Sequence, residues 1–169
     1  MSSHTIFDVW FTHRPERRKA ITIKPPGILN MTSFKTVIAI KDEKYCSEFC
    51  RLIRENFKDR QNIVAVASSL KDLVTICAIH HPNLVILESR FPDGDCYEVI
   101  SNLVHIHSGI KIIGISDNFQ LQVAKSLNAS GACGYFTNQD NRIITLDLIE
   151  RVLNLPEVQK RYGFETSIQ

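Results

Sequence analysis

The sequence predicts an α/β domain in which parallel strands and helices alternate along the chain. Three observations carry this prediction. The run L-V-I-L at residues 84–87 is apolar without interruption, which is typical of a short strand buried on both faces. Comparable apolar runs recur before and after it, separated by amphipathic stretches of helical length. Glu88, Asp93 and Gly94 follow the central run closely, as a charge and a turn do at the carboxyl edge of a parallel sheet, where ligands bind.

The region before the central strand predicts two strand–helix units. Residues 36–40 predict the first strand, and the next helix is expected to bury the stripe Tyr45, Phe49, Leu52, Ile53 and Phe57. Residues 63–67 predict the second strand. Ser69 and Asp72 form a capping-box start for the second helix, whose buried face we expect to contain Leu70, Leu73, Val74 and Cys77.

The third helix is expected directly after the central strand and its loop. Asp95 and Glu98 repeat the capping signal, and the apolar face of this helix would contain Val99, Ile100 and Leu103. The fourth strand is expected at residues 111–115, before Ser116 and Asp117.

The last two units follow the same pattern. Gly131 suits the left-handed cap at the end of a fourth helix, residues 133–136 predict a fifth strand, and residues 142–153 predict the final helix. Five strands alternating with five helices imply right-handed crossovers. We therefore expect a flavodoxin-like (βα)5 doubly wound sheet with strand order 2-1-3-4-5.

Residues 1–33 do not follow this pattern and are interpreted as an N-terminal arm and linker. Short strands are expected at 5–11 and 19–23, an arrangement consistent with a hairpin, and P-P-G at 25–27 would form a stiff connection. Between the strands, a basic cluster either contacts phosphate or an acidic partner or is a solvated loop; it contains Arg14, Arg17, Arg18 and Lys19. Residues 156–169 form a tail too short for a helix-turn-helix, so direct DNA binding is not expected.

Composition excludes few functions. The formal charge of +2 over 169 residues favours neither nucleic acid nor an acidic partner. No apolar run reaches the length of a membrane span and no secretory signal is present, so we expect a cytoplasmic protein without membrane contact. The odd count of five cysteines fits reduced thiols. Cys46 and Cys50 share a helix face, where we expect them to pack as small apolar groups rather than to bind metal or form a redox pair.

The run P-N-L-V-I-L-E-S-R-F-P, with Asp95 three residues after Pro92, resembles the central strand and following loop of response-regulator receiver domains. The resemblance covers about residues 36–154, within a receiver-like domain expected at 34–155. It implies a signalling module that is not an enzyme, and we expect no cofactor. In the family this strand ends in a phosphate-accepting aspartate, a position that Glu88 occupies here.

The resemblance also identifies the rest of a pocket. The family's acidic pair, which helps to hold a magnesium ion, matches Lys41 and Asp42. Lys41 is expected to replace the metal and to pair with Glu88 and Asp42, because an ammonium in the ion's coordination shell is strongly unfavourable. The hydroxyl and the aromatic switch of the family match Ser116 and Tyr135. Asn138 replaces the family's lysine and has no charge to neutralise a phosphoryl group.

These changes predict a pseudo-receiver: a stand-alone module that acts by protein–protein contact, without bound metal, and independently of phosphorylation. Glu88 is not expected to be phosphorylated, and either acts as a fixed negative charge on Ser116 and Tyr135 or is passive. Two alternatives remain. One is an unusual response regulator phosphorylated on a neighbouring carboxylate such as Asp42 within a two-component phosphorelay. The other is a flavodoxin-like ligand-binding protein or small enzyme, which would have to bind without a recognisable phosphate loop.

The final helix has a wide apolar stripe. The resemblance implies a protein partner or a homodimer through the fourth helix, fifth strand and fifth helix, and the residues expected there are Ile143, Leu146, Ile149, Val152 and Leu153. The alternative is that the N-terminal arm covers this helix. Four histidines fall at the ends of the second and third helices, where local dipole or solvent contacts are expected rather than ligand binding; they are His80, His81, His105 and His107.

Overall fold

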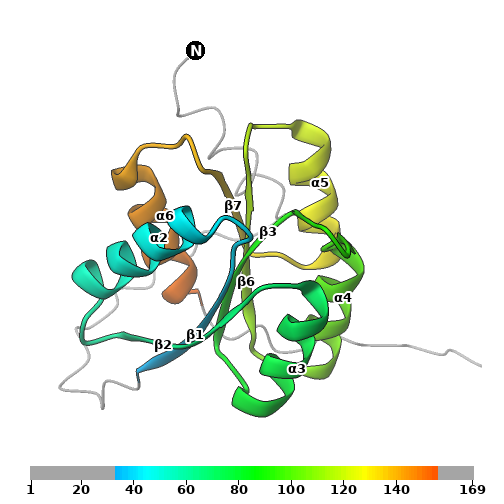
Figure 1. The fold of residues 1–169 in the computed structure, drawn as a ribbon, viewed down its shortest axis with the longest axis horizontal. Helices are drawn as coiled ribbons and strands as arrows, with labels where there is room; N and C mark the ends of the chain where they lie inside the picture. The colour runs from blue at the N-terminus through cyan, green and yellow to red at the C-terminus, as the bar shows by residue number, and fades with distance from the viewer. Residues whose placement is uncertain (1–32, 156–169) are drawn as a thin grey trace, which may run out of the picture.

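Five parallel strands form the central sheet of this computed structural model, which describes residues 33–155 (Figure 1). Their order is β2-β1-β3-β6-β7, and every neighbouring pair is parallel. This confirms the predicted doubly wound order. The strands are β1 (Phe34–Ala39), β2 (Gln61–Ala67), β3 (Leu84–Glu88), β6 (Lys111–Ser116) and β7 (Gly134–Thr137).

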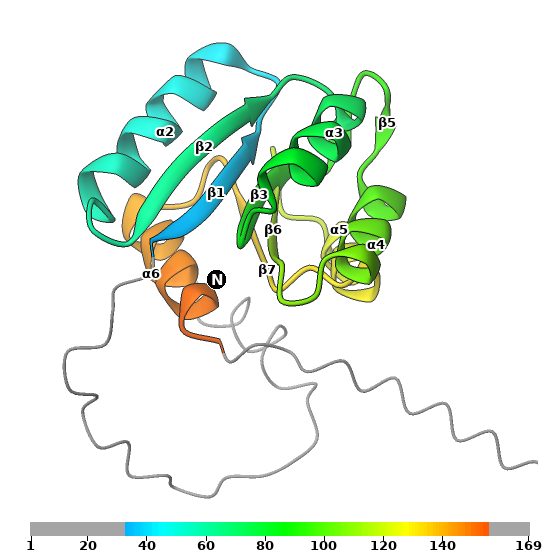
Figure 2. The same cartoon turned by 90° about the horizontal axis from the view of Figure 1, so that it is seen from below.

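Helices cover both faces of the sheet (Figures 1 and 2). One face carries α2 (Glu43–Asn56) and α6 (Arg142–Leu153), and the other carries α3 (Leu70–His80), α4 (Tyr97–Ile106) and α5 (Leu121–Ser130). Successive residues of β3 point to opposite faces, so Val85 belongs to one core and Ile86 to the other. This explains why the central strand is apolar at every position. Within residues 33–155, no helix is both long and apolar enough to cross a membrane.

Two predicted helix ends are confirmed. Ser69 accepts a hydrogen bond from the Asp72 N–H at the start of α3. Asp42 accepts one from the Tyr45 N–H at the start of α2, a cap that the sequence did not predict. Gly131 ends α5 in the left-handed conformation, with φ of +105°. The cysteine interpretation also holds for Cys46 and Cys50, whose thiols are buried in the core between α2, α6 and the sheet.

The start of α4 differs from the prediction. Asp95 does not cap this helix; it lies in a short antiparallel hairpin of β4 (Arg90–Phe91) and β5 (Gly94–Asp95) that the sequence did not predict. Cys96 occupies the N-cap position and makes no side-chain hydrogen bond there. The prediction was wrong because backbone pairing with Arg90 holds Asp95 in the hairpin, and its carboxylate lies 3.9 Å from the Arg90 guanidinium.

Two predicted apolar surfaces also need correction. Val74 is 44% exposed, because the buried face of α3 consists of Leu70, Leu73 and Cys77. On α6, three residues predicted to meet a partner are instead buried against the sheet: Ile149, Val152 and Leu153. Only Ile143 and Leu146 of that set reach the surface, since a helix that covers a strand uses most of its apolar stripe for the core. The predicted arm and tail, residues 1–32 and 156–169, lie outside the described residues.

Candidate functional site

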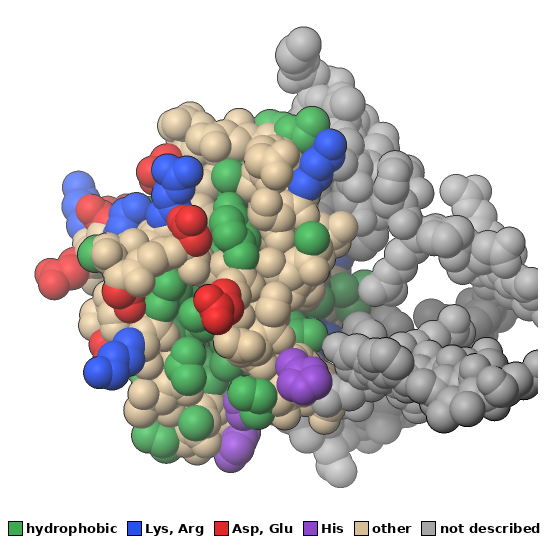
Figure 3. All heavy atoms as spheres, turned by 90° about the vertical axis from the view of Figure 1, so that its right-hand side faces the viewer, with side chains coloured by type: hydrophobic (Ala, Val, Ile, Leu, Met, Phe, Trp, Pro, Cys, Tyr) green, Lys and Arg blue, Asp and Glu red, His purple; other side chains and the backbone are tan. Residues whose placement is uncertain are grey.

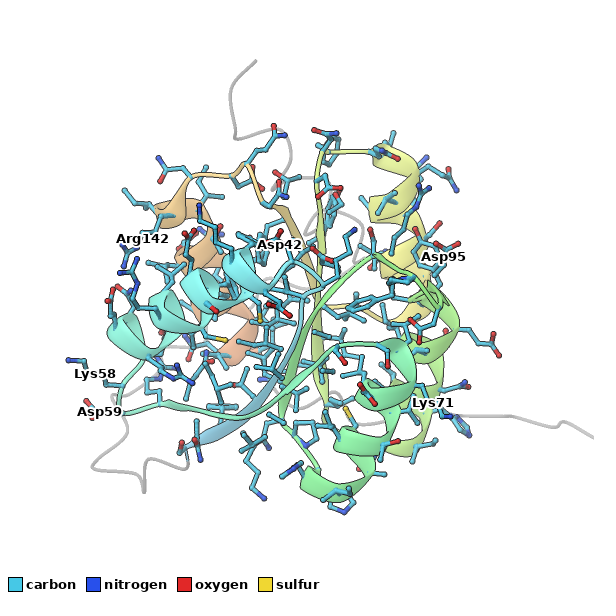
Figure 4. All side chains as sticks on the ribbon, in the orientation of Figure 1. Asp42, Lys58, Asp59, Lys71, Asp95 and Arg142 are labelled. Carbon is cyan, nitrogen blue, oxygen red and sulfur yellow. The ribbon has the colours of Figure 1, made fainter. Side chains whose placement is uncertain are left out.

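The predicted pocket lies at the carboxyl edge of the sheet, where β1, β3, β6 and β7 end. A hollow of about 100 Å³ opens there, and its wall includes Lys41, Glu88, Arg90, Ser116 and Asp117. This volume is enough for only a few water molecules. The other three predicted residues do not line the hollow: Asp42 begins α2 (Figure 4), Tyr135 lies within β7, and Asn138 follows it.

Glu88 ends β3 with only 6% of its surface exposed. Its Oε2 accepts a hydrogen bond from the Lys41 backbone N–H at 3.2 Å and lies 3.7 Å from the Lys41 ammonium. Burial raises the pKa of the Glu88 carboxyl above its usual value, and the hydrogen bond and charge of Lys41 oppose that rise. The nearby Asp117 carboxylate raises the pKa of Glu88 further. The predicted pair of Lys41 with Glu88 is therefore present in the structure.

Asp42 has a different contact from the one expected. Its Oδ1 accepts the Tyr45 N–H at 2.7 Å, and in residues 33–155 no ion pair joins Asp42 to Lys41. The cap satisfies a backbone donor that would otherwise have no partner in the first turn of α2. Asp42 thus serves the helix rather than the ion pair.

The residues at this edge do not fit a magnesium ion. Mg²⁺ requires near-octahedral oxygen ligands, usually with one or two carboxylates. Here the Glu88 carboxylate lies beside the Lys41 ammonium, and the Asp42 carboxylate caps α2. Across the described part of the chain, no three acidic, histidine or cysteine side chains gather closely enough to hold a metal ion.

Ser116 and Tyr135 are joined by a continuous set of hydrogen bonds. The Ser116 hydroxyl lies 2.5 Å from the Tyr135 hydroxyl and 2.7 Å from the Asn118 carbonyl oxygen, and the Gln120 N–H reaches the Tyr135 hydroxyl at 3.4 Å. The Tyr135 hydroxyl also donates to the Asn118 carbonyl oxygen at 3.2 Å, and either hydroxyl can be the donor in the contact between Ser116 and Tyr135. Tyr135 is held inward, 4% exposed.

The loop between β6 and α5 has two further ties that the sequence did not predict. The Asn138 side chain donates to the Asp117 carboxylate at 3.0 Å, and the Gln139 side chain donates to the Asn118 side-chain oxygen at 3.0 Å. Asn138 therefore positions the loop, in place of the ammonium that the family has there. No sequence signal could have identified these pairs, because their partners are adjacent only once β6 and β7 are paired.

Asp93 has a structural role that its turn sequence did not predict. Its carboxylate oxygens accept the backbone N–H groups of Leu70 and Lys71, both at 3.2 Å, and so fasten the β4–β5 hairpin to the start of α3. Desolvation raises the pKa of Asp93, but these backbone hydrogen bonds outweigh that effect and lower it. The hairpin beside Glu88 is consequently fixed to the fold at its tip.

Comparisons with known proteins agree with this architecture. The family model of the response regulator receiver domain matches residues 37–146. No curated protein sequence matches the chain. Solved structures with the same fold include a LuxR-family two-component response regulator from Aurantimonas sp. SI85-9A1, with 16% identity and a TM-score of 0.67, covering 72% of this chain and 86% of that one.

Two isolated receiver domains are similar to the same extent. The signal receiver domain of a DNA binding response regulator from Colwellia psychrerythraea 34H has 15% identity and a TM-score of 0.66, covering 73% of this chain and all of that one, 100%. The REC domain of RcsB from Salmonella enterica serovar Typhimurium has 11% identity and a TM-score of 0.67, covering 76% of this chain and 94% of that one. At such identities, these likenesses show the fold.

Proposed function

This chain belongs to the response regulator receiver domain family, and we propose that it is a pseudo-receiver: a cytoplasmic signalling module that acts through protein contacts without being switched by phosphorylation. Receiver domains are signalling domains and not enzymes. The observation that carries the proposal is the pairing of Glu88 with Lys41 at the position where the family has its phosphate-accepting aspartate.

Three differences from the family's residues each weaken phosphoryl transfer. In-line phosphoryl transfer depends on positioning and on neutralising the charge of the phosphoryl group. Lys41 stands where the family has a metal-binding carboxylate, Glu88 carries its carboxylate one methylene farther from the strand, and Asn138 supplies an amide in place of an ammonium. Asn138 is also hydrogen-bonded to Asp117 and is not directed at Glu88. These losses together support a fold that keeps its surfaces but not the chemistry.

The alternatives have less support. Phosphorylation of Asp42 would compete with its cap on α2, because the oxygen that accepts the Tyr45 N–H is part of the same carboxylate. A ligand-binding protein or small enzyme is less well supported: two hollows in residues 33–155 have volumes of about 100 and 220 Å³, below the roughly 300 Å³ at which small-molecule sites begin.

Intact mass spectrometry after incubation with Mg²⁺ and a small phosphodonor tests the proposal. The wild type is expected to gain no phosphoryl group. The matched control is the triple variant Lys41→Asp, Glu88→Asp, Asn138→Lys, which restores the family's residue types and should gain one. A stable phosphoryl group on the wild type would defeat the proposal, and its disappearance in Asp42→Asn would favour the two-component alternative.

A further inference from the structure

The described residues leave one apolar area of α3 and α4 uncovered. Ile79 on α3 is 67% exposed, Ile106 on α4 is 68% exposed, and Val74 and Ala78 on α3 are also exposed. We call these four residues the α3–α4 surface. Figure 3 shows hydrophobic side chains gathered on the side of the molecule that carries these helices. Exposed isoleucines on two neighbouring helices favour a covering partner more than a single exposed side chain does.

The C-terminal ends of the two helices lie next to each other. The imidazole rings of His81 and His107, which directly follow α3 and α4, have centroids 5.5 Å apart. Ile79 and Ile106 are within two residues of these histidines. The two most exposed side chains of the surface are thus at the same end of the domain, beside the amino edge of the sheet.

The chain enters the described fold at this same end. β1 begins at Phe34, and the Lys35 ammonium donates to the His80 carbonyl oxygen at 3.4 Å. The Lys35 backbone also pairs with Asn83 in both directions, at 2.9 Å each. The residues that precede β1 therefore start from a point fixed to the end of α3, close to Ile79.

The preceding sequence contains a segment that suits this surface. Residues 5–11, T-I-F-D-V-W-F, have five apolar side chains in seven positions, including the only tryptophan of the chain, Trp10. The 22 residues from 12 to 33 are enough chain to reach this surface. A random coil of that length has a root-mean-square span of roughly 25 Å, longer than the ~16 Å of a helix like α3. Such a tether gives an effective concentration on the order of millimolar, so a weak contact is sufficient for binding within one chain.

We propose that residues 5–11 of the same chain bind the α3–α4 surface and cover Ile79 and Ile106. Other exposed apolar residues suit this occupant less well. Phe119 and Leu121 lie at the start of α5, near the carboxyl edge and away from the entry of the chain. Val66 lies near the carboxyl end of β2, and Ile143 lies in the first turn of α6, on the other face of the sheet. The proposal goes beyond the signalling role above and does not depend on it.

Trp10 fluorescence of the full-length protein tests the proposal, because Trp10 is the single tryptophan and lies in the proposed occupant. The double variant Ile79→Ser, Ile106→Ser should increase the acrylamide quenching constant at least twofold and shift the emission to longer wavelength. Ile143→Ser removes an isoleucine that is 72% exposed on another helix and should change neither quantity. Far-UV circular dichroism of each variant checks that the fold is retained.

Three results would overturn the proposal. The first is that acrylamide quenches wild-type Trp10 as completely as in urea, and the second is that the double variant leaves the quenching constant unchanged. The third is a wild-type quenching constant that varies with dilution, which would identify a second copy of the chain as the occupant. A reciprocal measurement guards against indirect effects. In the variant Phe7→Ser, Phe11→Ser, the methyl resonances of Ile79 and Ile106 should move while that of Ile143 stays in place, and unmoved Ile79 and Ile106 resonances would also overturn the proposal.

Discussion

The Lys41 ammonium lies 3.7 Å from the Glu88 carboxylate, at the ends of neighbouring strands β1 and β3. The two residues arrive there because β1 and β3 are parallel and end at the same edge of the sheet. A positive charge supplied by the chain thus accompanies the buried negative charge. The Lys41 charge lowers the pKa of Glu88, whereas the Asp117 carboxylate raises it.

The first prediction concerns the pKa of Glu88, which is raised by burial. Lys41→Met should raise this pKa further, because it removes the nearby positive charge but keeps the backbone N–H that bonds Oε2. Asp117→Asn should lower it, because it removes a repelling carboxylate. Carboxyl ¹³C NMR titration of the wild type and both variants measures the shifts. Equal values in all three proteins would show that neither charge acts on Glu88.

The second prediction concerns stability as a function of pH. A carboxyl group whose pKa is raised by folding binds protons more tightly in the folded state, so its contribution falls as pH rises from the unfolded value of about 4.5 through the folded pKa. Glu88→Gln removes this loss and keeps an acceptor for the Lys41 N–H. The variant should therefore gain stability relative to wild type as pH rises above about 4.5, as measured by urea unfolding at several pH values. A difference in unfolding free energy that is constant with pH would contradict this.

The third prediction concerns the loop that Tyr135 holds. Tyr135→Phe removes the hydroxyl that bonds Ser116 and accepts the Gln120 N–H. We expect a loss of about 1 kcal/mol in unfolding free energy and faster hydrogen exchange at the Gln120 amide. Tyr97→Phe, at a partly buried tyrosine on α4, is the control and should leave the exchange of Gln120 unchanged. Unchanged exchange in Tyr135→Phe would mean that other contacts hold the loop.

The fourth prediction concerns the close approach of β6 to α5. A Cβ at Gly114 would lie 2.5 Å from Cδ1 of Leu127, a side chain with no exposed surface. Gly114→Ala should therefore destabilise the domain by about 1–3 kcal/mol through overpacking. The double variant Gly114→Ala, Leu127→Ala should lose less free energy than the two single changes added together, because the new methyl group enters the space that Leu127 leaves. If the losses of unfolding free energy in the two single variants simply add in the double variant, Gly114→Ala does not clash with Leu127.

The fifth prediction concerns Lys111, a lysine that is only 8% exposed. Its ammonium donates to the carbonyl oxygens of Leu153 and Leu155 at 2.8 and 2.6 Å, and so secures the end of α6. Lys111→Met should lower the unfolding free energy by about 2–3 kcal/mol. Lys125→Met, at an exposed lysine of α5, should change it by less than about 0.5 kcal/mol. Similar losses in both variants, measured by urea denaturation, would show that the carbonyl contacts contribute little.

Patterns within short stretches of sequence predicted most of the fold. The unbroken apolar run of β3, the cap at Ser69 and the glycine at Gly131 each depend on neighbours in sequence, and each is present as expected. Predictions failed where a distant segment decided the outcome. Asp95 has a capping sequence, but it pairs with Arg90 in a hairpin. The apolar stripe of α6 predicted that Val152 contacts a partner, yet Val152 is buried against the sheet.

The same division applies to the candidate site. The position of Glu88 follows from the end of the central strand, which sequence patterns locate well, whereas Ser116 and Tyr135 were identified by the resemblance to receiver domains. Their hydrogen bonds do not follow, because a hydroxyl or carboxylate has several partners within reach once the strands are aligned. Lys111 illustrates the limit: a lysine at the start of an apolar strand gives no sign that its ammonium is buried beneath the last turn of a helix.

Lys41 is part of the polypeptide, so the charge next to Glu88 comes with each folded molecule and needs no ion from solution. Under the proposed function, no phosphorylation step is needed to convert the protein from an inactive to an active form. The strength of the output would be set by how many copies exist, and therefore by the rates of synthesis and proteolysis. Such a molecule would report on gene expression over the lifetime of the protein rather than on a stimulus over the lifetime of an acyl phosphate.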